Sequence, residues 1–246
     1  PEPMSDQDDV APESIVYRHG PPLGDPGFSF GDPALIDDIT GHLEAHLGPV
    51  HVVYHELVSE YAHIDVHHFL PRPGRAFHVL ATSGMSERAM RVPEELTTDW
   101  RFAELLINLP AEWQVSQDSF RDERFYWPVR LLKTLARLPH VYATWLGYAH
   151  TIPNGEPPEP YESTTAMCAA MLVPPLSLGE AMHKLERPNG QVIRFWNVLP
   201  LYADEVKFKL RKGADALLDR FDAAGIADVV DPARPSVLTS KRWWRF

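Results

Sequence analysis

The sequence predicts an α/β (α+β) fold, in which a single layered domain has a central mixed, largely antiparallel β-sheet flanked by helices. Strand-like runs of apolar and polar residues occupy most of the chain between residues 50 and 199. Segments with helical periodicity stand at its beginning, middle and end. With 44% hydrophobic residues in a length of 246, the chain has enough apolar side chains to build a buried core.

The first predicted element is an amphipathic helix. Asp32 is a good N-cap, and Pro33 suits the first helical position. Apolar residues then recur at every fourth position as far as Gly48, and they are Leu35, Ile39, Leu43 and Leu47. We therefore divide the chain into an extended acidic, Pro/Gly-rich N-terminal arm, residues 1–31, and a domain, residues 32–246.

Four strand-like runs follow this helix, and the first three predict an antiparallel meander. Their ranges are Val50–Val58, His63–Leu70, Arg75–Thr82 and Ala103–Pro110. In the fourth run, apolar residues alternate with a mixed set that includes Glu104. One face of that strand is therefore expected to be apolar, with Glu104 on the other.

The second half of the chain predicts further helices and strands. A helix is expected from Trp127 to Leu138, where Pro139 ends it. The final helical region starts near Ala203 and ends at Gly225, and Gly213 leaves open whether it is one helix or two consecutive helices. The strands expected between these helices are Tyr142–Ile152, Thr165–Val173 and Gln191–Leu199.

The charge favours a protein partner over nucleic acid. The formal net charge is −11, and an acidic surface repels phosphate groups but attracts basic proteins. Five of the acidic residues fall within the first 13 positions. At the other end, residues 241–246 form a basic aromatic tag around Trp243 and Trp244. We expect this tag to fold back over an apolar groove, with partner docking as the alternative.

Cysteine content and the absence of targeting signals bound the class of protein. The single cysteine, Cys168, excludes a disulfide within one chain and a cysteine-based metal cage. No apolar run is long enough for a transmembrane helix, and the N-terminus lacks the features of a signal peptide. We therefore expect a cytoplasmic protein that requires no cofactor.

Most catalytic signatures are absent from the sequence, including the phosphate-binding loop and the zinc-binding helix motif. The stretch from Gly84 to Arg88 begins like a nucleophile elbow, but Arg88 stands where the second glycine is required. We predict instead a glycine turn, followed by a short helix at Glu87–Met90 that Ser86 caps.

Histidines are the remaining catalytic candidates. Within the 28 positions from His51 to His78 lie six of the twelve histidines, namely His51, His55, His63, His67, His68 and His78. In the strand-like run His63, Asp65 and His67 share a face and could hold a divalent metal. Whether His51 and His55 join them depends on the hairpin register, and so on the length of the connecting loop, which the sequence leaves open. A metal-assisted hydrolase is therefore the alternative function, although we expect no bound metal.

Several short pieces of sequence follow one another in an unusual order. They are Thr82, Gly84, Met85, Ser86 and Met90, then Ala103–Pro110, Trp113, Trp127, Pro128, Leu135–Pro139, Gly147 and Asn154–Pro157, then Pro200–Tyr202, Glu205, Asp231, Pro232 and Arg234. In this order and spacing they resemble the Suppressor of fused domain family, over the range from Gly31 to Arg234.

The resemblance implies a protein-binding domain without catalysis. Bacterial relatives are regarded as immunity proteins against polymorphic toxins, and the animal relative sequesters a transcription factor. We therefore expect a domain that masks a partner protein, and a basic toxin such as a nuclease would suit the acidic surface. The candidate partner-binding residues, in and around the loops 84–93 and 153–160, are Thr82, Gly84, Met85, Ser86, Glu104 and Glu156.

Three glutamates, Glu104, Glu156 and Glu205, stand in apolar contexts within pieces that resemble the family. A buried carboxylate needs hydrogen-bond donors, or it becomes protonated. We expect these three side chains to tie loops to the sheet through backbone N–H groups.

Overall fold

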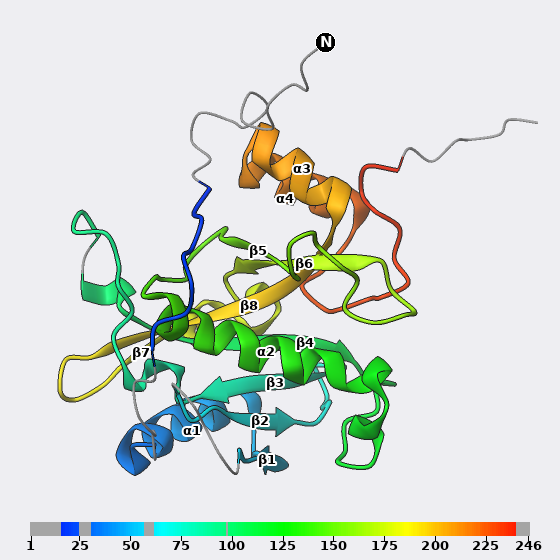
Figure 1. Cartoon of the computed structure of the whole chain (residues 1–246). Helices are drawn as coiled ribbons and strands as arrows, with labels where there is room; N and C mark the ends of the chain where they lie inside the picture. Colours follow the sequence, from blue (N-terminus) through cyan, green and yellow to red (C-terminus); the bar gives the residue numbers. More distant parts are fainter. Residues whose placement is uncertain (1–15, 25–30, 57–61, 97, 240–246) are drawn as a thin grey trace, which may run out of the picture.

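The computed structural model describes residues 16–24, 31–56, 62–96 and 98–239 (Figure 1). The acidic positions 2–13 and the basic aromatic tag at 241–246 lie outside the described residues. The described part contains four α-helices and one eight-stranded sheet, which confirms the predicted fold class. The division into an arm and a domain at residues 31 and 32 stays a prediction.

The elements have the following bounds. The α-helices are α1 Pro33–Leu47, α2 Glu123–Tyr142, α3 Ala203–Lys212 and α4 Ala214–Ala224. The strands are β1 Val52–Tyr54, β2 Asp65–Phe69, β3 Phe77–Ser83, β4 Phe102–Pro110, β5 Thr151–Pro153, β6 Met167–Val173, β7 Lys184–Glu186 and β8 Val192–Tyr202.

The sheet has the strand order β1-β2-β3-β4-β8-β6-β5, and β7 pairs with β8 outside this path. Strands β1, β2 and β3 form the predicted antiparallel meander, and β4 extends it by pairing antiparallel with β3. Strands β4 and β8 pair in parallel, with Leu105 opposite Trp196, and the pairs on the far side of β8 are antiparallel. The sheet is therefore mixed and largely antiparallel, and β4 lies near its centre.

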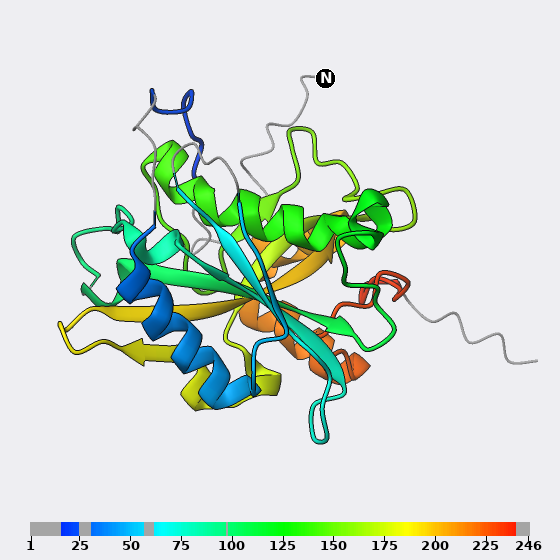
Figure 2. The same ribbon diagram turned by 90° about the horizontal axis from the view of Figure 1, so that it is seen from below.

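Helices cover both faces of the sheet, as the view from below shows (Figure 2). Helix α2 packs on one face, where Trp127 and Leu132 contact a core that includes Leu105. The opposite face is covered by α1 over one half of the sheet and by α4 over the other. Both faces of β4 are consequently buried, including the mixed face on which Glu104 was predicted.

The structure confirms α1 from its N-cap onward. The Asp32 carboxylate accepts a hydrogen bond from the backbone N–H of Ala34 at 3.0 Å, and Pro33 occupies the first turn. The four apolar residues at fourfold spacing are all buried. The end of the chain also follows the pattern, because Gly213, with φ of 88°, separates α3 and α4 into two consecutive helices.

The predicted end of α2 was wrong. The helix continues through Pro139 to Tyr142. The range Tyr142–Ile152, predicted as one strand, therefore contributes only to the short strand β5. Pro139 lacks a donor, but its carbonyl still accepts a hydrogen bond from the N–H of Thr144 at 3.0 Å. Ala143, with φ of 50°, then ends the helix in a left-handed conformation.

The structure differs from the sequence analysis at two other places. Ser86 lies within a 3₁₀ turn, Met85–Glu87, and does not cap a helix that starts at Glu87. Strand β7 was not predicted, because it has only three residues. No helix within the described ranges is long and apolar enough to cross a membrane.

Candidate protein-interaction site

The predicted partner-binding residues before β4 converge on one carboxylate. The Thr82 hydroxyl donates to Oε2 of Glu104 at 2.6 Å. The other carboxylate oxygen, Oε1, accepts from the backbone N–H of Gly84 at 3.0 Å and from that of Ser86 at 2.9 Å. The Ser86 hydroxyl donates to the same oxygen at 2.6 Å. Glu104 therefore ties the end of β3 and the following turn to β4.

This network lies in the interior of the protein. Glu104 is 0% exposed, and Thr82, Ser86 and Met85 are buried as well. Burial raises the pKa of the Glu104 carboxyl above its ordinary value, although the four donated hydrogen bonds act in the opposite direction. The expectation that Glu104 ties a loop to the sheet through backbone N–H groups is confirmed.

Gly84 is the residue that lets this turn approach its neighbours. Its φ of 108° lies in the left-handed region that disfavours side chains. A Cβ atom at this position would meet the carbonyl oxygen of His63 at 1.9 Å. The turn can therefore lie against the segment before β2 only because residue 84 has no side chain.

The predicted partner-binding residues fall into a buried group and one exposed residue. The partner-binding role of Thr82, Met85, Ser86 and Glu104 stays a prediction, and their burial restricts it to positioning the turn. Glu156 differs, because its side chain is 89% exposed and lies 3.6 Å from the guanidinium of Arg18. It is not one of the carboxylates that tie a loop to the sheet.

A second buried carboxylate holds the C-terminal segment. Arg234 contacts both carboxylate oxygens of Glu205, at 2.6 and 2.8 Å. Glu205 also accepts from the backbone N–H groups of Tyr202 and Val237, each at 3.0 Å. This confirms the structural role predicted for Glu205. These contacts of Glu205 anchor the segment that follows α4 to the end of β8.

Of the predicted metal-ligand residues, His63 and Asp65 are in contact, whereas His67 has a different partner. Asp65 contacts His63 Nε2 at 3.1 Å and His55 Nδ1 at 2.9 Å, and the register of β1 and β2 places His55 beside Asp65. His67 instead contacts the Ser83 hydroxyl at 2.9 Å, and burial lowers its pKa to about 4. The trio of His63, Asp65 and His67 is therefore not brought together.

The other histidines of the strands form a separate pair. His68 Nε2 lies 2.9 Å from His78 Nδ1, and His78 Nε2 contacts the carbonyl of Ala111 at 3.1 Å. Burial lowers the pKa of His68 to about 3. Within the described residues, no group of three or more His, Cys, Asp or Glu side chains is placed to hold a metal. This geometry gives no support to the hydrolase alternative.

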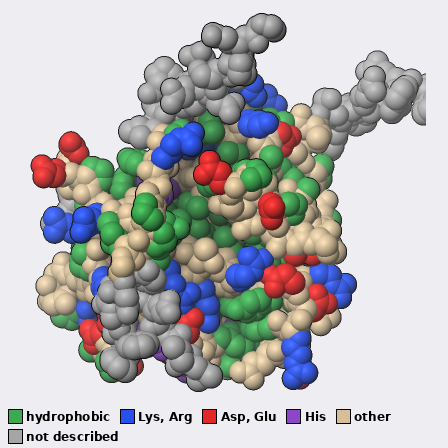
Figure 3. All heavy atoms as spheres, in the orientation of Figure 1, with side chains coloured by type: hydrophobic (Ala, Val, Ile, Leu, Met, Phe, Trp, Pro, Cys, Tyr) green, Lys and Arg blue, Asp and Glu red, His purple; other side chains and the backbone are tan. Residues whose placement is uncertain are grey.

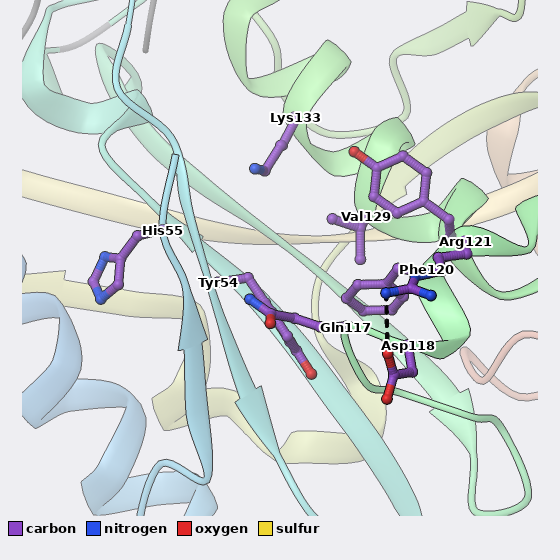
Figure 4. Close-up of a pocket in the computed structure, with 9 residues that line it drawn as sticks. Tyr54, His55, Gln117, Asp118, Phe120, Arg121, Val129 and Lys133 are labelled. Atoms are coloured by element: carbon purple, nitrogen blue, oxygen red, sulfur yellow. Dashed lines mark ion pairs between the residues drawn. The ribbon is translucent and has the colours of Figure 1, made fainter. Parts of the chain in front are cut away.

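A surface depression of about 400 Å³ lies between β1, α2 and the loop that precedes α2 (Figure 4). It is lined by Tyr54, His55, Gln117, Asp118, Phe120, Arg121, Tyr126, Val129 and Lys133. The Phe120 ring meets Tyr54 edge-on at 4.9 Å and lies 5.7 Å from Tyr126. Figure 4 shows Lys133 on the α2 side and the ion pair of Asp118 with Arg121, 3.6 Å apart, on the loop side.

The depression combines aromatic rings with charged side chains. Its cations have acidic neighbours, as in the pair of Lys133 with Glu56 at 3.8 Å. Aromatic rings with polar edges are typical of protein interfaces. The sequence analysis did not find this site, because residues 54 and 120 meet only in the folded chain. The aromatic residues Phe120, Phe125 and Tyr126 were its available signal.

The comparison with protein families decides the relationship. The model of the Suppressor of fused protein family matches residues 60–235. The chain belongs to the Suppressor of fused family. This confirms the resemblance, and the match starts later in the chain than the predicted first residue, Gly31. Among curated proteins, none matches the sequence.

Solved structures of Suppressor of fused proteins share the fold. A homologue from Neisseria gonorrhoeae has 17% identity and a TM-score of 0.63, with coverage of 85% of this chain and 100% of that one. A structure of the Sufu–Fu complex has 15% identity and a TM-score of 0.57, covering 83% and 91%. Drosophila Suppressor of Fused has the same identity and TM-score, covering 87% of this chain and 54% of its own.

Proposed function

We propose that this protein is a non-catalytic, protein-binding domain that masks a partner, and that it acts in the cytoplasm as an immunity protein against a basic toxin such as a nuclease. The family membership carries the proposal, because a family member is known in the Sufu–Fu complex. The buried carboxylates Glu104 and Glu205 support it, since their hydrogen bonds are used to hold the fold together.

The charge supports a basic partner. A net charge of −11 raises the encounter rate with positively charged proteins at low salt. On the face shown in Figure 3, lysine and arginine side chains lie among the acidic ones around a central apolar area. The proposed steering therefore comes from the total charge, whereas the contact itself uses apolar and aromatic side chains.

The predicted residues receive two different roles in this proposal. Glu156 contacts the partner directly, because it is exposed at the loop 153–160. Thr82, Ser86 and Glu104 act indirectly, by holding the backbone of the loop that starts at Gly84. The depression around Phe120 supplies a pocket for an apolar side chain of the partner.

The test uses a basic nuclease captured with the unmodified chain from its native cells. We expect a complex of equal stoichiometry and loss of nuclease activity on titration with the chain. Stopped-flow association should slow as the salt rises from about 0.01 M to 1 M, because the Debye length falls from about 30 Å to about 3 Å, and the dissociation rate should change less.

Two variants make the binding test specific. Phe120→Ala removes an aromatic ring from the depression and should weaken the complex about tenfold, as expected for a central aromatic contact. Leu176→Ala is the matched control, because Leu176 is 67% exposed and does not line the depression. This variant should bind normally. An association rate that does not depend on salt would refute the claim that the partner is basic. Catalytic modification of the captured protein by this chain would refute the claim that the chain acts by masking.

A further inference from the structure

The N-terminal segment 16–24 lies against the body of the domain. The backbone N–H of Leu23 donates to the carbonyl of Val141 at 2.9 Å. The His19 ring stacks on Tyr142 with 5.3 Å between ring centroids. Figure 1 shows this segment in dark blue, passing the C-terminal end of α2.

Apolar exposure is concentrated at this contact. Eight large hydrophobic side chains of the described residues are exposed, and four of them lie in the segment or in contact with it. Val16, Tyr17 and Leu23 belong to the segment, and Tyr142 stacks against its His19. A monomer rarely leaves such side chains grouped without a use for them. The grouping therefore indicates a surface for binding rather than a scatter of single residues.

A charged contact accompanies the aromatic ones. The Arg18 guanidinium lies 3.6 Å from the Glu156 carboxylate, and the ring of Tyr17 lies 6.3 Å from that of His150. Both members of the ion pair are highly exposed, so that it contributes little to stability. The segment is therefore held by contacts that another chain could replace.

The sequence of the segment keeps it extended. Pro21 and Pro22 fix their φ angles and favour an extended conformation, so that little entropy is lost when the segment lies on a surface. The domain surface around Tyr142 and Glu156 already accommodates an extended segment in which an aromatic ring lies next to a cation, as in Tyr17-Arg18-His19.

We propose that Tyr142, His150 and Glu156 form a docking surface for an extended segment of the partner protein that carries an aromatic ring next to a cationic side chain. Residues 16–24 occupy this surface as a built-in competitor, which the partner displaces. The inference rests on the proposed partner-binding function. It also specifies the partner's side chains, because Arg18 occupies the position opposite Glu156 that a cationic side chain of a basic partner would take.

The competition follows from the tether. A segment of the same chain competes at an effective concentration on the order of 1 mM, so that a free peptide with a dissociation constant on the order of 0.1–1 mM is weakened about two- to tenfold. An incoming peptide must therefore overcome the attached segment, and weakening that segment should raise the apparent affinity about fivefold.

The experiment uses the full chain and a labelled synthetic peptide with the sequence of residues 16–24. Binding is measured by fluorescence anisotropy to the natural chain and to an arm variant that combines Tyr17→Ala, Arg18→Ala and His19→Ala. These side chains are exposed, so that the arm variant should fold normally. We expect the peptide to bind the arm variant about fivefold more tightly than the natural chain.

Matched variants identify the surface. Glu156→Gln introduced into the arm variant should weaken peptide binding and reduce its salt dependence, whereas Leu176→Ala in the arm variant should leave binding unchanged. A peptide with Arg18→Ala should lose the dependence on Glu156. Equal binding to the natural chain and the arm variant, or no binding to either, would overturn the proposal.

The partner assay separates this inference from the proposed function. If the chain inhibits a basic nuclease but the arm variant inhibits it with the same affinity, partner binding stands and the built-in competitor is refuted. If the peptide binds as expected but no protein partner is masked, the surface stands and the proposed function fails.

Discussion

Removal of the Glu104 carboxylate should destabilise the domain strongly, whereas its replacement by an amide should not. Glu104→Ala leaves the backbone N–H groups of Gly84 and Ser86 without an acceptor. Both groups are held in a buried turn and cannot rotate toward another partner. The hydroxyls of Thr82 and Ser86 can rotate, so that they add less to the loss.

The magnitude follows from the two orphaned donors. A buried donor without a partner costs about 1–3 kcal/mol, so that two of them reduce the free energy of unfolding by about 4 kcal/mol. For a domain of this size, 1 kcal/mol corresponds to about 2–4 °C in the thermal midpoint. We therefore expect Glu104→Ala to lower the midpoint by about 8–16 °C.

Glu104→Gln is the informative partner of this variant. Its carbonyl oxygen can replace Oε1, which accepts three of the four hydrogen bonds. Its amide can face the Thr82 hydroxyl, which then accepts from the amide and no longer donates to a carboxylate. We expect a loss of about 1 kcal/mol, because a single hydrogen bond changes its direction.

Thermal and guanidinium unfolding, followed by circular dichroism, measure both variants. Glu112→Ala is the control, because it removes an exposed carboxylate just after β4. Two results would refute the reasoning: a loss below about 1 kcal/mol for Glu104→Ala, or an equal loss for the alanine and glutamine variants.

Three further predictions concern acid, the N-terminal tail and metal. Burial lowers the pKa of His67 to about 4 in the folded chain, whereas this histidine in the unfolded chain binds a proton once the pH falls below about 6.5. The free energy of unfolding should therefore fall by about 3 kcal/mol by pH 4. His68 acts in the same direction, and unfolding measured at pH 7 and pH 4 checks the sign; equal stability at both would contradict it. Deletion of residues 1–13 should shift the thermal midpoint by less than about 4 °C, since few apolar side chains are lost, and calorimetry would reveal a larger fall if the tail were docked. Elemental analysis of protein purified without a histidine tag should find less than one equivalent of metal, and a full equivalent would revive the hydrolase alternative.

Local signals explain what the sequence predicted well. The start of α1 depends on an N-cap and a proline that are adjacent in sequence, and its buried face depends on a fourfold spacing. The division of the last helical region depends on one glycine, Gly213. In each case the residues that determine the structure lie within a few positions of one another.

Long-range contacts explain what the sequence did not predict. The histidine trio failed because His67 finds its partner, Ser83, on the neighbouring strand, 16 positions away. The depression around Phe120 depends on Tyr54, which the fold of the sheet brings to it. Neither pairing is visible in the periodicity of the chain. The end of α2 was misplaced for a local reason, because Pro139 lacks a donor but keeps its acceptor.

The residues that carry the family resemblance mark the fold more than the interface. Thr82, Gly84, Ser86 and Glu104 form one buried network, and Arg234 closes another. Such networks require particular side chains at particular positions, because a missing partner leaves a buried group unsatisfied. An interface can change its residues while the fold stays the same. The pattern therefore identifies the domain, and the partner has to be inferred from surface side chains such as Glu156, which is exposed beside the N-terminal segment.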